Sequence, residues 1–435
     1  MVRHGLLRRM VARQMRTGDL GSRLMMDPAV REDPFPYYDE LRGQGRLVRT
    51  GLALISAHHD VCLAVLRSPD FGQMRLGRTP RVLQLGMKLG GRPVLTPVEP
   101  PSMVAVDPPE HTRYRKLVTR AFCARTIAAM RPRIEQIAET LLDEIIQSSA
   151  AGPVDLVSRY ASLLPATVIA EMLGAPVSMR RQFLDWGVGA SLSLDMGLSY
   201  RDFRRAELDI TALHRWMLGH FNDVRRAPGD GILGSLVAAY DQGDQLTLDE
   251  LSSISMLLLA AGFETTVNLL GNGAVLLMRH PDQLDVLRAQ PQRWAGAVEE
   301  ILRYESPVQR TGRLALRDTE VAGLPVTAGS FIVVLLGGAN RDPVVFPDPH
   351  RFDVTRPEAD QNLAFSSGIH YCIGAALARL EGEIGLRALF RRFPDLALTG
   401  IPHRRPTRVL RGYDAIPVRL DQSRAENYVG LNLKG

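Results

Sequence analysis

One cysteine near the C-terminal end of the chain has the surroundings of a reactive thiolate. Cys372 lies in the segment FSSGIHYCIG, and the helical pattern AALARLEGE follows it. A helix N-terminus favours negative charge and lowers the pKa of a thiol. Gly368 and Gly374 let the backbone turn and approach a flat ligand. The pattern predicts a shielded thiolate that binds haem iron, and the alternative is a buried free cysteine in a glycine-bearing turn.

An acid and an alcohol lie in the middle of a long apolar helical pattern, in the segment AGFETT at 261–266. Such groups are costly inside an apolar helix unless they are used. A threonine can donate its hydroxyl hydrogen to a carbonyl one turn back, and Gly262 eases a local bulge. Glu264 and Thr265 would then lie in a groove above the iron and pass protons to bound dioxygen. A kink that is satisfied internally is the alternative.

Two further pairs of charged residues have the spacing of one helix face. Glu300 and Arg303 are three apart, and His111 and Arg115 are four apart. A Glu–Arg pair at this spacing is common on protein surfaces and stabilises little. Taken alone, each of these residues is expected to be a solvated surface residue.

These segments together resemble the motifs of the cytochrome P450 family. The cysteine segment is similar to the family form F-G-x-G-x-H-x-C-x-G, with Ser366 where glycine is commoner. The segment AGFETT is similar to the family's oxygen-activation motif. The order of DPPEHTRYR, AGFETT, the Glu300–Arg303 pair, PHRF and the cysteine segment is also the family's order. The resemblance spans essentially residues 27–420.

The resemblance implies one haem b between the long helix and the cysteine segment, with Cys372 as the iron ligand. The other expected haem contacts are Ala261, Phe365 and Gly374, and the expected propionate partners are His111, Arg115, Arg313 and His370. Two arginines and two histidines suit two propionates, because charge-assisted hydrogen bonds are strong. The resemblance also implies a structural, non-catalytic triad behind the haem, formed by Glu300, Arg303 and Arg351.

The activity implied by the resemblance is that of a monooxygenase, because the family's peroxide-using branch lacks the acid–alcohol pair. The enzyme would use dioxygen to hydroxylate or epoxidise an apolar small molecule: a lipid, terpenoid, steroid or polyketide. With the loop 71–106, the residues expected to line the substrate pocket are Ala260, Ala261, Thr265, Val308 and Gln309. The alternatives are a relative that performs dehydration, coupling or isomerisation, a non-catalytic haem sensor or carrier, and a haem-free helical binding protein.

Electrons are expected from a separate ferredoxin and ferredoxin reductase, since no residues remain for a fused redox domain. An acidic ferredoxin could be steered to a basic face on the cysteine side. The candidate residues of this face are Arg113, Lys116, Arg120 and Arg379. A merely solvated charged face is an equally good interpretation.

Composition limits the other functions. The 435 residues include 53 basic and 47 acidic ones, for a net charge of +6. The basic residues are spread along the chain, which argues against nucleic-acid binding. Cys62, Cys123 and Cys372 form no CxxC pair, so neither a zinc site nor a disulfide scaffold is predicted. No run reaches the length of a membrane span, and a cytoplasmic monomer is expected.

Helical patterns dominate from about residue 107 to 303, and strand-like runs lie at 46–55, 330–336 and 413–420. A capping box at Thr247 and Glu250 and a stop at His280-Pro281 predict one helix long enough to cross the molecule. Asp107 and Glu110 predict another capped start. The expected fold class is mainly α with small β sheets, the cytochrome P450 fold in a single large domain.

The two ends of the chain are expected to lie outside that domain. Residues 1–26 form a basic amphipathic extension, for which a helix packed on the protein body is favoured over weak peripheral membrane contact. Residues 27–420 form the P450 domain. Residues 421–435 form a polar tail to which no function is assigned.

Overall fold

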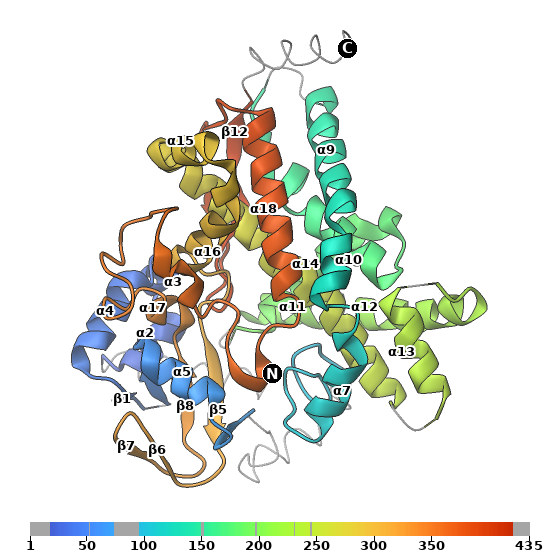
Figure 1. Cartoon of the computed structure of the whole chain (residues 1–435). Coiled ribbons are helices and arrows are strands. Elements are labelled where there is room, and N and C mark those ends of the chain that lie inside the picture. Colours follow the sequence, from blue (N-terminus) through green and yellow to red (C-terminus); the bar gives the residue numbers. More distant parts are fainter. Residues whose placement is uncertain are drawn as a thin grey trace.

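The computed structural model describes residues 18–51, 53–73, 95–148, 152–195, 198–229, 231–243 and 246–420. Helices gather around one long central helix, and the sheets lie at the edges of the molecule (Figure 1). The N-terminal helices pack beside the largest sheet, away from the α9, α10 and α18 group. The predicted class, mainly α with small β sheets in a single large domain, is confirmed.

The α-helices of the described residues have these bounds: α2 Leu20–Met26, α3 Pro28–Glu32, α4 Phe35–Gln44, α5 His59–Arg67, α7 Glu110–Thr119, α8 Ala124–Ala129, α9 Arg131–Ser148, α10 Leu163–Leu173, α11 Arg180–Leu192, α12 Tyr200–Arg226, α13 Ile232–Asp241, α14 Leu248–Arg279, α15 Pro281–Ala289, α16 Trp294–Tyr304, α17 Leu336–Ala339 and α18 Ala375–Arg392. The strands are short: β1 Val48–Arg49, β2 Leu54–Ser56, β3 Phe71–Gly72, β4 Val154–Asp155, β5 Thr311–Ala315, β6 Thr319–Val321, β7 Leu324–Val326, β8 Phe331–Val334, β9 Ala397–Leu398, β10 His403–Arg404, β11 Tyr413–Ala415 and β12 Pro417–Arg419.

The largest sheet has the order β1-β2-β8-β5-β3. Within it, β2 and β8 are parallel and the other pairs are antiparallel. The three predicted strand runs all contain strands, but each strand covers only part of its run. The sheet presents β5 to the interior of the molecule, where Arg313 is buried.

The long helix α14 organises the core. Its capping box is present, because Thr247 Oγ1 accepts from Glu250 N and Glu250 Oε2 accepts from Thr247 N at 2.8 Å. The helix ends at Arg279, as predicted. By length and composition α14 is the one helix among the described residues that could cross a membrane, yet 83% of its most apolar window is buried inside the protein. The helix α14 is therefore a core helix, and it packs against α10, α11 and α18.

The predicted cap of α7 is wrong. The helix begins at Glu110 and its first turn receives no side-chain hydrogen bond. Pro108 and Pro109 follow Asp107 and have no N–H to donate to its carboxylate. Asp107 Oδ1 instead accepts a hydrogen bond from Gln73 N at 2.9 Å. The carboxylate therefore ties the start of α7 to the end of β3.

Some predictions fall outside the described residues. Most of the basic N-terminal extension, 1–17, lies there, as do 74–94 of the predicted loop and the tail 421–435. The end of the extension forms α2, whose Leu20 and Leu24 are buried and whose Leu20 carbonyl accepts from Tyr37 Oη at 2.9 Å. This end packs on the protein body.

Candidate active site

A cavity of about 300 Å³ lies between α14 and the cysteine segment. One wall is the stretch of α14 from Leu257 to Leu269, and the opposite wall runs from Ala364 to Ala378. His111 and Arg115 of α7 and Arg313 of β5 close one side. The structure thus brings Cys372, the four predicted propionate partners and Thr265 to one space, whereas Glu264 is not one of the lining residues.

The loop before α18 holds Cys372 at the cavity. Cys372 N donates to the carbonyl of Phe365 at 3.0 Å, which closes the loop over the short turn Gly368–His370. Gly368 has φ +70°, and a Cβ there would collide with the carbonyl of Leu66. A glycine is therefore required at this position, both by conformation and by the close approach of α5. Phe365 and Gly374 line the cavity beside Cys372, as predicted.

The pKa of the Cys372 thiol differs from the sequence-based expectation. Burial raises this pKa, and the opposing effects of Gly374 N–H, Arg115 and Arg379 do not reverse the shift. This direction is opposite to the one expected from the helix N-terminus, since desolvation disfavours the charged form. The surroundings of Cys372 suit a thiolate whose charge is balanced by a bound metal.

Ser366 occupies the one family-atypical position of the loop. It has φ +62°, in the left-handed region that favours glycine, and its buried Oγ has no hydrogen-bond partner among the described residues. Ser366→Gly is expected to increase the free energy of unfolding by about 1 kcal/mol, because a Cβ is disfavoured in this region. Urea unfolding of the haem-bound protein measures it.

Gly368→Ala is expected to change the free energy of unfolding in the opposite direction to Ser366→Gly, because it adds a Cβ where the backbone of α5 leaves no space. It is expected to lower the same free energy. If Ser366→Gly were no more stable than the parent protein, the left-handed conformation would not be a source of strain in this loop.

Four basic side chains gather at one edge of the cavity. The rings of His111 and His370 lie 4.3 Å apart, centroid to centroid. Burial, together with Arg313, His111 and Arg115, lowers the pKa of His370 to about 3. Burial lowers the pKa of Arg313 to about 10. His370 Nε2 is buried without a hydrogen-bond partner among the described residues, and Oδ1 of Asp107 lies 3.9 Å away.

Two guanidinium groups beside two imidazoles, one with an unpartnered ring nitrogen among the described residues, are suited to an anionic ligand. Two carboxylates of one flat molecule would supply the missing hydrogen bonds and balance the guanidinium charges. Haem propionates fit this requirement, and the cysteine lies across the same cavity. The donor set therefore fits haem b.

The predicted oxygen-activation motif differs in detail from its expected geometry. Thr265 Oγ1 donates to the carbonyl of Ala261 at 3.1 Å, and both residues line the cavity. The predicted bulge at Gly262 is wrong, because α14 stays α-helical through this segment. A Cβ at Gly262 would lie 2.7 Å from Cγ1 of Ile169. Its glycine therefore permits close packing of α10 against α14.

Glu264 is held by a partner that sequence reasoning missed. It is buried, and Arg405 Nη1 donates to its Oε1 in an ion pair. Arg405 also lies 3.7 Å from Oδ1 of Asp414, whose side chain is 56% exposed. These three residues form a polar chain from the middle of α14 toward the surface. No local signal reveals Arg405, because it lies 141 positions after Glu264.

Two of the residues predicted to line the substrate pocket do not line the cavity. Ala261 and Val308 line it. Ala260 instead packs among Ala190 and Ile210. Gln309 turns to the other face of the wall, where its amide donates to the carbonyl of Ser306 at 2.7 Å and it lines a separate small pocket. Its register beside Val308 explains this, since neighbouring residues of an extended segment point to opposite sides.

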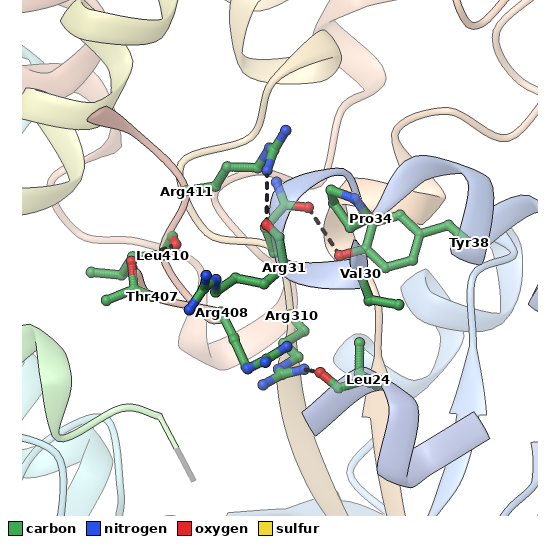
Figure 2. Close-up of a pocket in the computed structure, with 11 residues that line it drawn as sticks. Leu24, Val30, Arg31, Pro34, Tyr38, Arg310, Thr407, Arg408, Leu410 and Arg411 are labelled. Carbon is green, nitrogen blue, oxygen red and sulfur yellow. Dashed lines mark hydrogen bonds between the residues drawn. The ribbon is translucent and has the colours of Figure 1, made fainter. Parts of the chain in front are cut away.

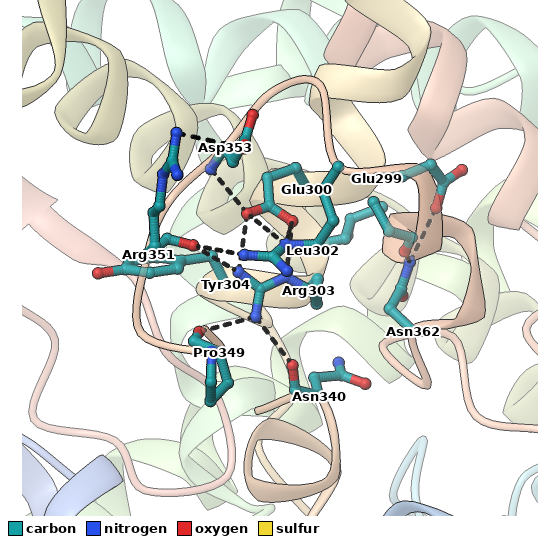
Figure 3. A network of polar contacts seen from close by, with 12 residues as sticks. Glu299, Glu300, Leu302, Arg303, Tyr304, Asn340, Pro349, Arg351, Asp353 and Asn362 are labelled. Carbon is teal, nitrogen blue, oxygen red and sulfur yellow. Dashed lines mark hydrogen bonds and ion pairs between the residues drawn. The ribbon is translucent and has the colours of Figure 1, made fainter. Parts of the chain in front are cut away.

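The predicted triad contains a different third arginine. Glu300 and Arg303 form a fully buried bidentate pair, at 2.6 Å and 2.7 Å (Figure 3). The side chain of Arg351 is 65% exposed and faces Asp353, while its carbonyl accepts from Arg303 at 3.1 Å. Arg356 supplies the second guanidinium, 3.4 Å from Glu300. Sequence spacing near Glu300 gives no signal for Arg356, because the two meet only through the fold.

The four residues of the predicted basic face are not equally free to contact a partner protein. Arg113 pairs with Glu250 at 2.6 Å, and Arg379 pairs with Glu299 and donates to Tyr371 Oη. Lys116 and Arg120 are exposed on α7 and just after it. Any charge available for a partner therefore comes mainly from these two residues.

The comparisons with known proteins agree with this site. A family model described as Cytochrome P450 matches residues 202–400. Cytochrome P450 140 of Mycobacterium tuberculosis is 47% identical over 427 residues, 97% of each chain. The 6-deoxyerythronolide B hydroxylase of Saccharopolyspora erythraea is 46% identical over 74% of this chain and 78% of its own. A structure of P450BioI in complex with hexadec-9Z-enoic acid ligated acyl carrier protein has a TM-score of 0.81 at 30% identity, covering 90% of this chain and 100% of that one.

The fold and the cavity define a haem-thiolate oxygenase. The chain belongs to the cytochrome P450 family, whose members bind haem b through a cysteine thiolate. It is therefore an oxidoreductase that incorporates oxygen into a small-molecule substrate. The predictions of family, fold, cofactor and enzyme class are confirmed, and a haem-free binding protein and a non-catalytic haem carrier are excluded.

Proposed function

We propose that this enzyme hydroxylates or epoxidises an apolar small molecule, using electrons from a separate ferredoxin and its reductase. The observation that carries the proposal is the position of Thr265, whose hydroxyl lies on the apolar α14 wall of the cavity. When bound, haem supplies the iron at which dioxygen is activated. The protein must then bind the substrate beside it and deliver protons to the same place.

The cavity wall supports an apolar class of substrate. Leu257, Leu258, Ala261 and Val308 offer carbon atoms, so an apolar molecule is stabilised there by the hydrophobic effect. One relative is named for the hydroxylation of 6-deoxyerythronolide B, and one related structure holds a hexadec-9Z-enoic acid chain. Both support an apolar lipid or polyketide, with terpenoids and steroids in the same class.

Proton delivery is assigned to residues of this chain. Thr265 holds its hydroxyl toward Ala261, where it can donate into the cavity after a small rotation. Glu264 connects α14 to the surface through Arg405 and Asp414. Since general acids act through positioned hydrogen bonds, Thr265 would pass the proton inside the cavity, and Glu264, buried one residue before it, would take part in supplying the proton from the solvent side.

The double variant Glu264→Ala with Thr265→Ala tests this assignment. The product formed per molecule of dioxygen consumed is expected to fall by about 10²-fold or more, as for loss of a general acid. The missing oxygen should be recovered as hydrogen peroxide. Product analysis beside oxygen-electrode measurements gives the ratio.

Thr140→Ala is a matched control, because this exposed threonine of α9 also donates to a carbonyl one turn back, that of Gln136 at 2.9 Å. It should leave the ratio unchanged. Unchanged product yield in the double variant would contradict monooxygenation through this pair and favour dehydration, coupling or isomerisation.

Electron supply by an acidic ferredoxin is part of the proposal. The support is the exposure of Lys116 and Arg120 near the cysteine side, since exposed cations accelerate association with an acidic partner. A cytoplasmic, monomeric enzyme is proposed with it. Peripheral membrane contact through residues 1–17 stays a prediction.

A further inference from the structure

A second, much smaller pocket lies behind one wall of the active-site cavity. Its volume is about 20 Å³. It lies where α3 and α4 meet the segment before β5 and the turn before β11 (Figure 2). The proposed function makes no use of it.

The wall between the two spaces is one pair of extended segments. Val308 forms a β-bridge with Leu410, and Gln309 N donates to the carbonyl of Val409 at 2.8 Å. Val308 lines the active-site cavity, whereas Gln309 and Leu410 line the small pocket. The pocket is therefore a separate space with a shared wall.

Three arginines line this pocket with few hydrogen-bond acceptors. Arg310 is only 9% exposed, and its Nη1 donates to the carbonyl of Leu24 at 3.1 Å. Arg408 donates from Nη1 to the carbonyl of Asp27 at 2.8 Å. Arg31 is exposed at the mouth, and no side-chain hydrogen bond of Arg31 occurs within the described part of the chain. Figure 2 shows the three guanidinium groups around the pocket.

The acids nearby do not balance these three charges. Arg411, the fourth arginine of the lining, is paired with Glu305. The carboxylate of Asp195 accepts instead from two backbone groups, Arg408 N and Val409 N, each at 2.8 Å. Among the described residues, no ion pair joins Asp195 to Arg31, Arg310 or Arg408. The pocket thus keeps an excess of positive charge.

The electrostatic cost of this arrangement is visible at Arg408. Burial, together with the charges of Arg310 and Arg31, lowers the pKa of Arg408 to about 10, against the opposing charges of Asp195 and Asp27. An additional negative charge in the pocket would remove this repulsion. Guanidinium groups with unused N–H donors are the usual partners of carboxylate and phosphate oxygens.

We propose that this arginine pocket binds one oxyanion, a carboxylate or a phosphate group, at a site separate from the haem cavity. A volume of about 20 Å³ holds roughly one water-sized group. The pocket therefore admits one oxygen atom of the charged head group. The rest of the ligand lies outside, past the exposed Arg31.

Isothermal titration of the haem-bound enzyme with inorganic phosphate and, separately, with acetate tests the site. Ionic strength is held constant with chloride, so that general screening does not change. At least one of the two anions is expected to bind saturably with a Kd on the order of 1 mM or below, from two or three charge-assisted hydrogen bonds. Phosphate alone, acetate alone or both would identify the head group.

Arg408→Gln and Arg31→Gln should each weaken this binding by about tenfold or more, the loss of one charge-assisted hydrogen bond. Arg31 is exposed, so its variant keeps the test valid if Arg408→Gln does not fold. Arg226→Gln is the matched control, because Arg226 is 77% exposed and pairs only with its helix neighbour Asp223 among the described residues. It should bind as the parent does.

Two results would overturn the site: no saturable binding of either anion to the parent enzyme, or unchanged binding in both pocket variants. Neither result bears on the monooxygenase proposal, since the titration involves no turnover. Loss of oxygen coupling in the Glu264 and Thr265 variant would likewise leave the anion site intact.

Discussion

Replacing Cys372 by serine is expected to remove both turnover and the red-shifted Soret band of the reduced carbon monoxide complex. The band depends on thiolate ligation of the iron, and a serine hydroxyl cannot supply a thiolate. The loop itself should persist, because its closing hydrogen bond uses the backbone N–H of residue 372 and the carbonyl of Phe365. Absorption spectra of the reduced, carbon monoxide-bound variant give the answer directly.

The other two cysteines supply the controls. Cys62 is buried, and burial raises its pKa to about 12, so it remains a thiol. Cys123 is exposed before α8 and away from the cavity lining. Cys123→Ser should keep the thiolate-type spectrum. A Cys372→Ser protein that also kept it would refute the ligand assignment.

Breaking the buried Glu300–Arg303 pair is expected to be the most destabilising change in the chain. Both side chains have no exposed area, and Arg303 also donates to the carbonyls of Asn340 and Pro349. Arg303→Met leaves the buried Glu300 with Arg356, at 3.4 Å, as its remaining cationic partner, and breaking a buried ion pair typically costs about 3–5 kcal/mol. Urea unfolding with haem loss as a second signal measures the change in the free energy of unfolding.

The double variant Glu300→Leu with Arg303→Met separates charge from packing. Since no unpaired carboxylate is left, its loss of stability should be smaller than that of Arg303→Met alone. Arg226→Met removes an exposed helix pair and should change stability by less than about 1 kcal/mol. If Arg303→Met were as mild as this control, the buried pair would not be a structural requirement.

Features that depend only on residues close together in the sequence were predictable from the sequence. The capping box at Thr247 and the stop at His280 define α14, because both act within one helical turn. The cysteine loop was predictable for the same reason: its glycines and Cys372 are only a few residues apart, and the family motif covers them. The helical spacing of His111 and Arg115 placed them on one face of α7.

The tertiary structure alone decided which distant side chains meet. Arg356, not Arg351, reaches Glu300, and Arg405 finds Glu264. Gln309 faces away from the cavity because strand register, not residue type, sets its direction. Local chemistry thus determined the elements and the candidate iron ligand, whereas burial and long-range packing determined the partners of the charged groups.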